Sequence, residues 1–200
     1  MSFEIISNNN KLICNSGYFQ KIKHKLNDIS KSSANHSTLI IDNHSSCKIN
    51  PSNLEIVQEL KILKKEVVME KNYWSICSSH DGYNKRYGII HERKMEFFPE
   101  NNKFIGSDKL LKKKNFKASN FEIRFHLEPN VKIMKTQDGK SILIDIDNEG
   151  WKFTSEGNTI DVETGLYFGK KNSYTENQNL FISGVTRNDE QNIKWEFIKI

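Results

Sequence analysis

Apolar and polar residues alternate strictly along short segments of this chain, and no other feature limits its fold as much. Phe121, Ile123, Phe125 and Leu127 alternate with charged or polar neighbours. Successive side chains of a β-strand point to opposite faces, so a period of two is typical of a strand with one buried face. The segment therefore predicts a sheet that is covered on one side.

Turn residues separate further segments of this kind. Asp138-Gly139 lies between residues 131–136 and 141–146, and an Asp-Gly pair in such a place is a strong hairpin signal. Many short strands at close spacing favour an all-β fold, an antiparallel, sandwich-like domain of stacked sheets with little helix. We expect one domain over residues 1–200. Further strands are predicted at 150–154, 159–162, 165–168, 180–184 and 193–200.

One segment permits two interpretations. Residues 52–65 have spacing compatible with a helix, the best helix candidate in the chain. The same region is also compatible with two strands, at 55–62 and 66–77. The pattern alone leaves both alternatives open.

Composition excludes several classes of protein. The net charge is only +5, and the densest basic run, 109–117, lacks the regular aromatic residues of a nucleic-acid platform, so no nucleic-acid partner is expected. Membrane insertion is not expected either, because no run approaches the roughly 18 apolar residues of a membrane helix. No signal peptide is visible, and the start at an expected strand suggests a domain of something longer. Cys14, Cys47 and Cys77 form neither a disulfide framework nor a zinc pair, and we expect buried thiols.

Histidines are the residues best suited to chemistry. His36, His80 and His126 each lie beside an apolar or alternating run. Imidazole titrates near neutral pH and can serve as a base, an acid or a metal ligand. His91 and Arg93 alternate in one expected strand and share a face, which suits either an anion contact or an ordinary polar face. From the residues alone, a structural, hydrogen-bonded role is the alternative for each of them.

Several short motifs occur in one order along nearly the whole chain, and together they are far more specific than any one of them. The chain resembles the C-terminal β-sheet domain of the heparinase II/III-like polysaccharide lyases. The motifs are Cys-Asn-Ser-Gly-Tyr at 14–18, Ala-Asn-His-Ser-Thr-Leu-Ile-Ile-Asp at 34–42, Ser-His-Asp-Gly-Tyr at 79–83, Tyr-Gly-Ile-Ile-His-Glu-Arg at 87–93, Ile-Arg-Phe-His-Leu-Glu-Pro at 123–129 and Glu-Gly-Trp-Lys-Phe at 149–153.

The resemblance implies a reaction and a partner domain. Lyases of this family cleave uronic-acid-containing acidic polysaccharides by β-elimination, which needs a base near C5, neutralisation of the carboxylate and an acid at the leaving oxygen. One wall of the family's cleft is an N-terminal helical toroid, and this chain has no candidate for it. The other wall is the β domain, which supplies a histidine from an H-[NS]-T segment. That histidine is His36 here, and the isolated chain is expected to be catalytically inert.

Substrate contacts are expected from the chemistry of individual side chains. For an acidic polysaccharide we expect substrate contacts from Tyr83, His91, Arg93 and Arg124. Tyr83 also has the alternative of a packing residue.

No cofactor is expected to be required for the reaction. Some family members hold a structural metal in this domain, and zinc bound by His80, a second histidine such as His126 and an Asp is the corresponding hypothesis here. However, the family's metal-binding version has a second histidine two residues after the catalytic one, and this chain has Thr38 at that position.

Three functions remain open at this stage. The first is the lyase domain, which predicts that His36 faces an open cleft. The second is a non-catalytic carbohydrate-binding module with an exposed aromatic platform. The third is a structural β domain in which His36 is buried and an apolar patch docks a partner. Family resemblance places such a lyase in the periplasm or cell envelope.

Overall fold

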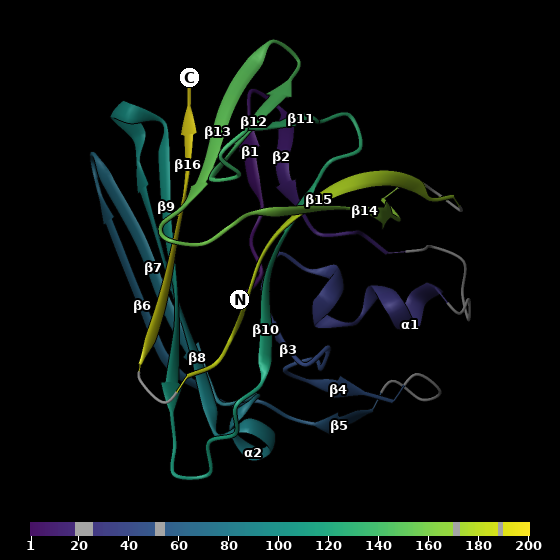
Figure 1. Cartoon of the computed structure of the whole chain (residues 1–200), viewed down its shortest axis with the longest axis vertical. Coiled ribbons are helices and arrows are strands. Elements are labelled where there is room, and N and C mark those ends of the chain that lie inside the picture. Colours follow the sequence, from purple (N-terminus) through teal and green to yellow (C-terminus); the bar gives the residue numbers. More distant parts are fainter. Residues whose placement is uncertain (19–25, 51–54, 170–172, 188–189) are drawn as a thin grey trace.

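Two antiparallel sheets face each other in the computed structural model of the chain, which describes residues 1–18, 26–50, 55–169, 173–187 and 190–200 (Figure 1). The all-β sandwich predicted from the alternating segments is confirmed. In the eight-stranded sheet the strand order is β11-β12-β13-β16-β9-β8-β7-β6. Its strands are β6 (Ile62–Glu70), β7 (Tyr73–His80), β8 (Ile89–Phe98), β9 (Lys103–Lys112), β11 (Lys132–Lys135), β12 (Ser141–Ile146), β13 (Glu149–Ser155) and β16 (Gln191–Lys199).

The six-stranded sheet has the order β1-β2-β10-β15-β14, and β3 also pairs with β10. A separate pair, β4 and β5, forms a small hairpin. The remaining strands are β1 (Ile5–Ser7), β2 (Asn10–Cys14), β3 (Leu39–Ile41), β4 (Lys48–Ile49), β5 (Ile56–Gln58), β10 (Asn120–Leu127), β14 (Asp161–Tyr167) and β15 (Thr175–Val185).

Helices are few and short in the described part of the chain. They are α1 (Leu26–Ser30), α2 (Asn84–Tyr87) and two 3-10 turns, η1 (Ser33–Asn35) and η2 (Pro99–Asn101). Helix α1 lies on the side of the six-stranded sheet that faces away from the eight-stranded sheet (Figure 1). None of the helices that the structure describes is long and apolar enough to cross a membrane.

The helix interpretation of residues 52–65 is wrong for residues 55–65. Residues 51–54 are not among the residues that the structure describes. Strand β5 and the start of β6 occupy the region. The two-strand alternative has the right type but the wrong limits, because the chain turns at Lys71-Asn72 between β6 and β7. The single strand β14 likewise replaces the two strands expected at 159–162 and 165–168.

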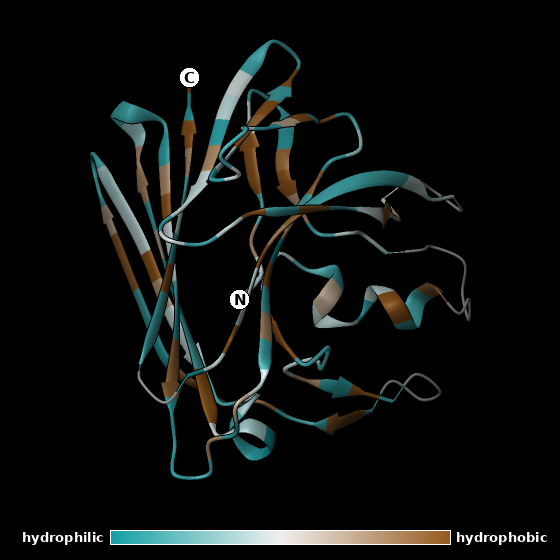
Figure 2. Cartoon of the chain, viewed as in Figure 1, coloured by the Kyte–Doolittle hydropathy of each residue, from teal (hydrophilic) through white to brown (hydrophobic). Residues whose placement is uncertain are grey.

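The alternating residues meet in the core between the sheets, and bands of hydrophobic and hydrophilic residues alternate along the strands (Figure 2). The ring of Phe125 lies 4.8 Å from that of Phe153 and 5.0 Å from that of Trp195. Gly106 is required opposite Trp195, because a Cβ atom there would come within 2.0 Å of the indole. Burial of such rings supplies most of the stability of a two-layer sheet domain.

Candidate functional site

His36 lies at the end of η1, three residues before β3 begins, and its backbone is extended. Its backbone N–H donates to the Ser33 carbonyl at 3.2 Å, and its backbone carbonyl accepts the Thr38 N–H at 2.7 Å. The imidazole is partly exposed. Partial burial lowers the pKa of His36, and a hydrogen bond with the Ser30 backbone opposes that effect. At neutral pH the ring is therefore uncharged and can accept a proton.

Ser37, the next residue, is fully buried and uses every polar atom. Its N–H donates to the Asn15 Oδ1 atom at 3.1 Å. Its hydroxyl donates to the Cys14 carbonyl at 2.8 Å and accepts a hydrogen bond from the backbone N–H of His126 at 2.9 Å. The main chain beside His36 is thus held by two strands of the six-stranded sheet, β2 and β10.

His126 and Arg124 lie on the outer face of β10, as the alternation predicts. His126 is buried, and its Nε2 atom lies 2.9 Å from the Ala34 carbonyl. The pKa of His126 is lowered to about 4, mainly by burial, with smaller contributions from the charges of Arg124 and His36 and an opposing hydrogen bond with the Ala34 backbone. Arg124 forms ion pairs with Glu122 and Glu163, so its guanidinium is already occupied by two carboxylates.

His91 and Arg93 share a face, as expected, but it is the inner face of the eight-stranded sheet. Both are buried and bind Asp108, with His91 Nε2 at 2.6 Å and Arg93 Nε at 2.7 Å from its Oδ1 atom. Burial alone would raise the pKa of Asp108, but Arg93 and His91 hold it well below its usual range. These side chains are therefore not available to a polysaccharide in this structure, and Asp108 was not anticipated from the sequence.

Tyr83 is also buried, and its hydroxyl donates to the Leu39 carbonyl at 2.8 Å. The packing alternative describes it, and its ring cannot stack on a sugar. His80 ends β7, and its Nδ1 atom accepts the Gly82 N–H at 3.1 Å. The pKa of His80 is lowered to about 3, mainly by burial and to a smaller extent by the nearby His91.

The structure does not bring His80 and His126 together as metal ligands. His80 lies in the eight-stranded sheet against His91, with ring centroids 5.3 Å apart, while His126 lies on the outer face of the other sheet. Within the described ranges no group of three or more His, Cys, Asp or Glu side chains is placed to hold a metal ion. The residues present therefore do not fit the zinc hypothesis.

The cysteines are free thiols, two buried and Cys47 partly exposed.

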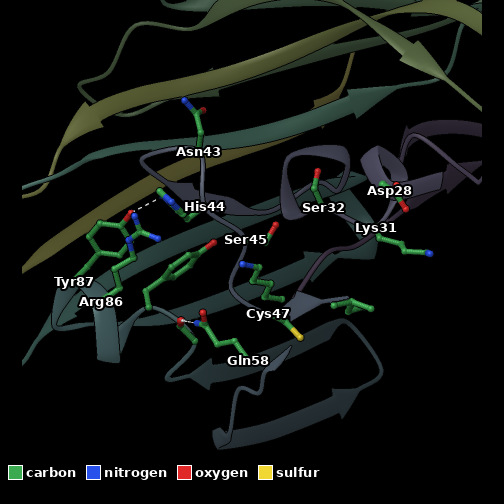
Figure 3. A pocket seen from close by; sticks show the side chains of 14 residues that line it. Asp28, Lys31, Ser32, Asn43, His44, Ser45, Cys47, Gln58, Arg86 and Tyr87 are labelled. Carbon is green, nitrogen blue, oxygen red and sulfur yellow. Dashed lines mark hydrogen bonds between the residues drawn. The ribbon is translucent and has the colours of Figure 1, made fainter. Parts of the chain in front are cut away.

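A half-open pocket of about 400 Å³ lies beside η1 (Figure 3). Ser32, which immediately precedes η1, is on its rim, and Arg86, Tyr87 and His44 gather at one end. The Tyr87 hydroxyl lies 2.7 Å from the His44 Nδ1 atom. Lys31, Lys48 and Arg86 line the pocket, and none has an acidic partner within 4 Å among the described residues. Its lining residues are Asp28, Lys31, Ser32, Asn43, His44, Ser45, Cys47, Lys48, Ile49, Gln58, Gly82, Tyr83, Arg86 and Tyr87.

Sequence reasoning missed this pocket because its cations come from segments far apart in the chain. Helix α1, the β4–β5 hairpin and α2 each contribute to the wall. The sequence carried one weak signal, which is that Arg86 lies directly before the Tyr87 motif.

The buried histidines predict acid sensitivity. Because His126 and His80 have pKa values of about 4 and about 3 when folded, against about 6.5 when unfolded, the unfolded chain binds their protons first. Stability is therefore full above pH 6.5 and declines as the pH falls below it, by up to about 1.4 kcal/mol per pH unit for each histidine. Urea unfolding between pH 6.5 and 5 measures this slope. His126→Asn should reduce it, and an equal slope in the variant would contradict the assignment.

A family model and several solved structures each match nearly the whole chain. The family model described as "Heparinase II/III-like, C-terminal" matches residues 1–196. The heparan sulfate lyase HepC from Pedobacter heparinus has a similar structure, with a TM-score of 0.80 and 15% identity over 99% of this chain and 30% of its own. A heparinase III structure gives a TM-score of 0.70 and 16% identity over 100% of this chain and 29% of its own. No curated protein sequence matches.

This chain thus spans about 30% of the length of the solved structures that it matches. At such low identity those structures establish the fold, and the family model, which covers nearly every residue, establishes the relationship. The chain belongs to the heparinase II/III-like family and corresponds to its C-terminal domain.

Proposed function

We propose that this chain is the C-terminal β domain of a polysaccharide lyase that cleaves uronic-acid-containing acidic glycans by β-elimination, and that it contributes His36 to the reaction. The observation that carries the proposal is the state of His36. Its imidazole is partly exposed and uncharged at neutral pH, and the next residue, Ser37, is held by hydrogen bonds from its backbone N–H and its hydroxyl. A base that is held in one place and has a pKa near or below the working pH suits proton transfer.

In the proposed reaction, the His36 imidazole assists removal of the proton at C5 of the uronate. The electron pair of the broken C–H bond forms the C4–C5 double bond, and the C4–O bond breaks. The leaving oxygen then takes a proton from an acid. An uncharged ring fits the base role better than carboxylate neutralisation, which needs a positive charge or strong donors. Those donors, and the acid, are assigned to the remaining domain, proposed to be a helical toroid.

The experiment that tests this function follows the absorbance of unsaturated uronate against a panel of acidic glycans. The protein assayed is the longer form that carries the region its relatives have beyond this domain. Turnover of at least one uronate-containing glycan is expected, and none is expected from the 200-residue chain alone. Failure of the longer protein on every such glycan would overturn the proposal. Turnover by the isolated chain would overturn the assignment of the remaining catalytic groups to another domain. The periplasm or cell envelope is the proposed location, where acidic polysaccharides are met.

The pocket beside η1 is proposed to contact an acidic group of the same glycan. Arg86→Gln removes a cation that has no acidic partner in the described structure, so the Kd for an acidic oligosaccharide should rise about threefold to tenfold. Isothermal titration of the isolated chain measures this. The matched control is Lys103→Gln, because Lys103 pairs with Glu196 at the far end of β9. An equal change in both variants would point to a general charge effect.

One observation favours a second candidate, a non-catalytic glycan-binding module. Trp74 is 44% exposed and its ring lies 5.1 Å from that of Phe97, which makes an aromatic surface on the eight-stranded sheet. This module would bind neutral and acidic sugars through stacking. Glycan binding that is lost in Trp74→Ala but kept in Arg86→Gln would favour it.

A further inference from the structure

Arg93 crosses from one layer of the sandwich to the other. It belongs to β8 of the eight-stranded sheet, yet its Nη1 atom donates to the Ser37 carbonyl at 2.7 Å and to the Met1 carbonyl at 3.0 Å. Its Nε and Nη2 atoms bind the two oxygens of Asp108 at 2.7 and 3.0 Å. Such a two-pronged pair fixes the plane of the guanidinium, so the third arm has a set direction.

The surroundings of Arg93 leave it little freedom. Its guanidinium carbon lies 5.5 Å from the ring centre of Phe3 and 5.7 Å from that of Trp195. Asp108 also accepts hydrogen bonds from Trp195 Nε1 at 2.8 Å and from His91. The carboxylate is thus held by four donor contacts, and the arginine is oriented before any ligand arrives.

Tyr83 makes a second tie of the same kind. Its hydroxyl donates to the Leu39 carbonyl at 2.8 Å from the turn that follows β7. Arg93 and Tyr83 therefore donate hydrogen bonds to the backbone carbonyls of Ser37 and Leu39. These two residues flank Thr38, and Ser37 directly follows His36. Each of these donors is at least 97% buried, so solvent does not compete for the bonds.

We propose that Arg93, oriented by Asp108, and Tyr83 are positioning residues that fix the main chain of residues 37–39 and thereby set where the His36 imidazole stands. This inference rests on the proposed function of His36, but its structural part does not. Catalytic groups lose much of their effect when displaced by as little as about 1 Å, which gives such a device a purpose beyond stability.

The test uses amide hydrogen exchange and histidine titration by NMR on the 200-residue chain. Arg93→Lys keeps a cation beside Asp108 but lacks the fork that reaches Ser37 as well. Exchange at Ser37 and Thr38, taken relative to Ile144 in β12 of the other sheet, should accelerate about tenfold or more. The pKa of His36 should move back toward its usual value as the ring is released.

Phe153→Leu is the matched control, because Phe153 is a buried core ring of β13 that packs against Phe125 and Phe197, away from the ties made by Arg93 and Tyr83. It should leave the relative exchange of Ser37 and Thr38 unchanged even if overall stability falls. Tyr83→Phe is the second variant and removes only the hydroxyl, with an expected acceleration of about fivefold at Thr38. If Arg93→Lys does not fold, Tyr83→Phe decides alone.

Unchanged relative exchange and an unchanged His36 titration in the folded variants would overturn the proposal. In the longer protein, the positioning role predicts a lower kcat with KM nearly unchanged for Arg93→Lys. Loosening of residues 37–39 in a protein without lyase activity would refute the proposed function and leave the positioning intact. Full lyase activity with a loosened segment would refute the positioning role alone.

Discussion

Replacing Asp108 with alanine is expected to lower the free energy of unfolding by about 3–5 kcal/mol, the usual cost of breaking a buried ion pair. The change leaves the Arg93 charge buried without a carboxylate. It also removes the acceptor for the His91 and Trp195 ring N–H groups. An unpaired charge in a dry core costs more than the pair contributes, so the effect is larger than the loss of the individual hydrogen bonds.

Urea unfolding at pH 7 measures this loss, and Glu196→Ala is the comparison. Glu196 pairs with Lys103 where both side chains remain partly exposed, so its removal should cost less than about 1 kcal/mol. Asp108→Asn should fall between the two, since the amide keeps one acceptor and the shape of the side chain. If Asp108→Ala cost no more than Glu196→Ala, the buried network would not be a stabilising centre of this fold.

The strands could be predicted from sequence because one periodicity decides them. Strand β10 agrees with the alternation of residues 121–127, and β12 follows the Asp138-Gly139 turn as expected. The limits of β6 and β7 could not be predicted, because β6 is an edge strand whose residues are mostly exposed. Its apolar residues therefore do not report a buried face.

The faces of β8 show where the prediction of site residues failed. His91 and Arg93 look like a polar face when taken alone, but Ile89 and Met95 lie on the same side of the strand. The opposite side, with Glu92, Lys94 and Glu96, is the charged one. A reading of the whole strand contains the signal that His91 and Arg93 point inward. Asp108 gives no such signal, since its pairing with Arg93 depends on the β8–β9 register.

His36 was a candidate because it lies beside an apolar run, and its H-[NS]-T segment supplied the proposed role through the family resemblance; the structure places it just outside the strand. The pocket beside η1 could not be predicted, because packing between distant segments forms it. Local periodicity reports which face of a strand is buried, but it does not report which segments meet across the fold.

His36→Ala is expected to have the largest effect on activity. Loss of a positioned base reduces catalysis by typically 10²–10⁴-fold, and because the side chain is partly exposed, its removal costs little burial beyond the hydrogen bond with the Ser30 backbone. The fold should therefore survive the change, with a stability within about 1 kcal/mol of the parent protein. The control is Lys132→Ala in the exposed strand β11, outside the proposed site.

The most direct test of the account is the kcat for β-elimination by the longer protein, measured for the parent, His36→Ala and Lys132→Ala, with circular dichroism to verify folding. The account predicts that kcat falls at least about a hundredfold in His36→Ala and is unchanged in Lys132→Ala. A folded His36→Ala variant that keeps kcat within about twofold of the parent would contradict the catalytic role of His36.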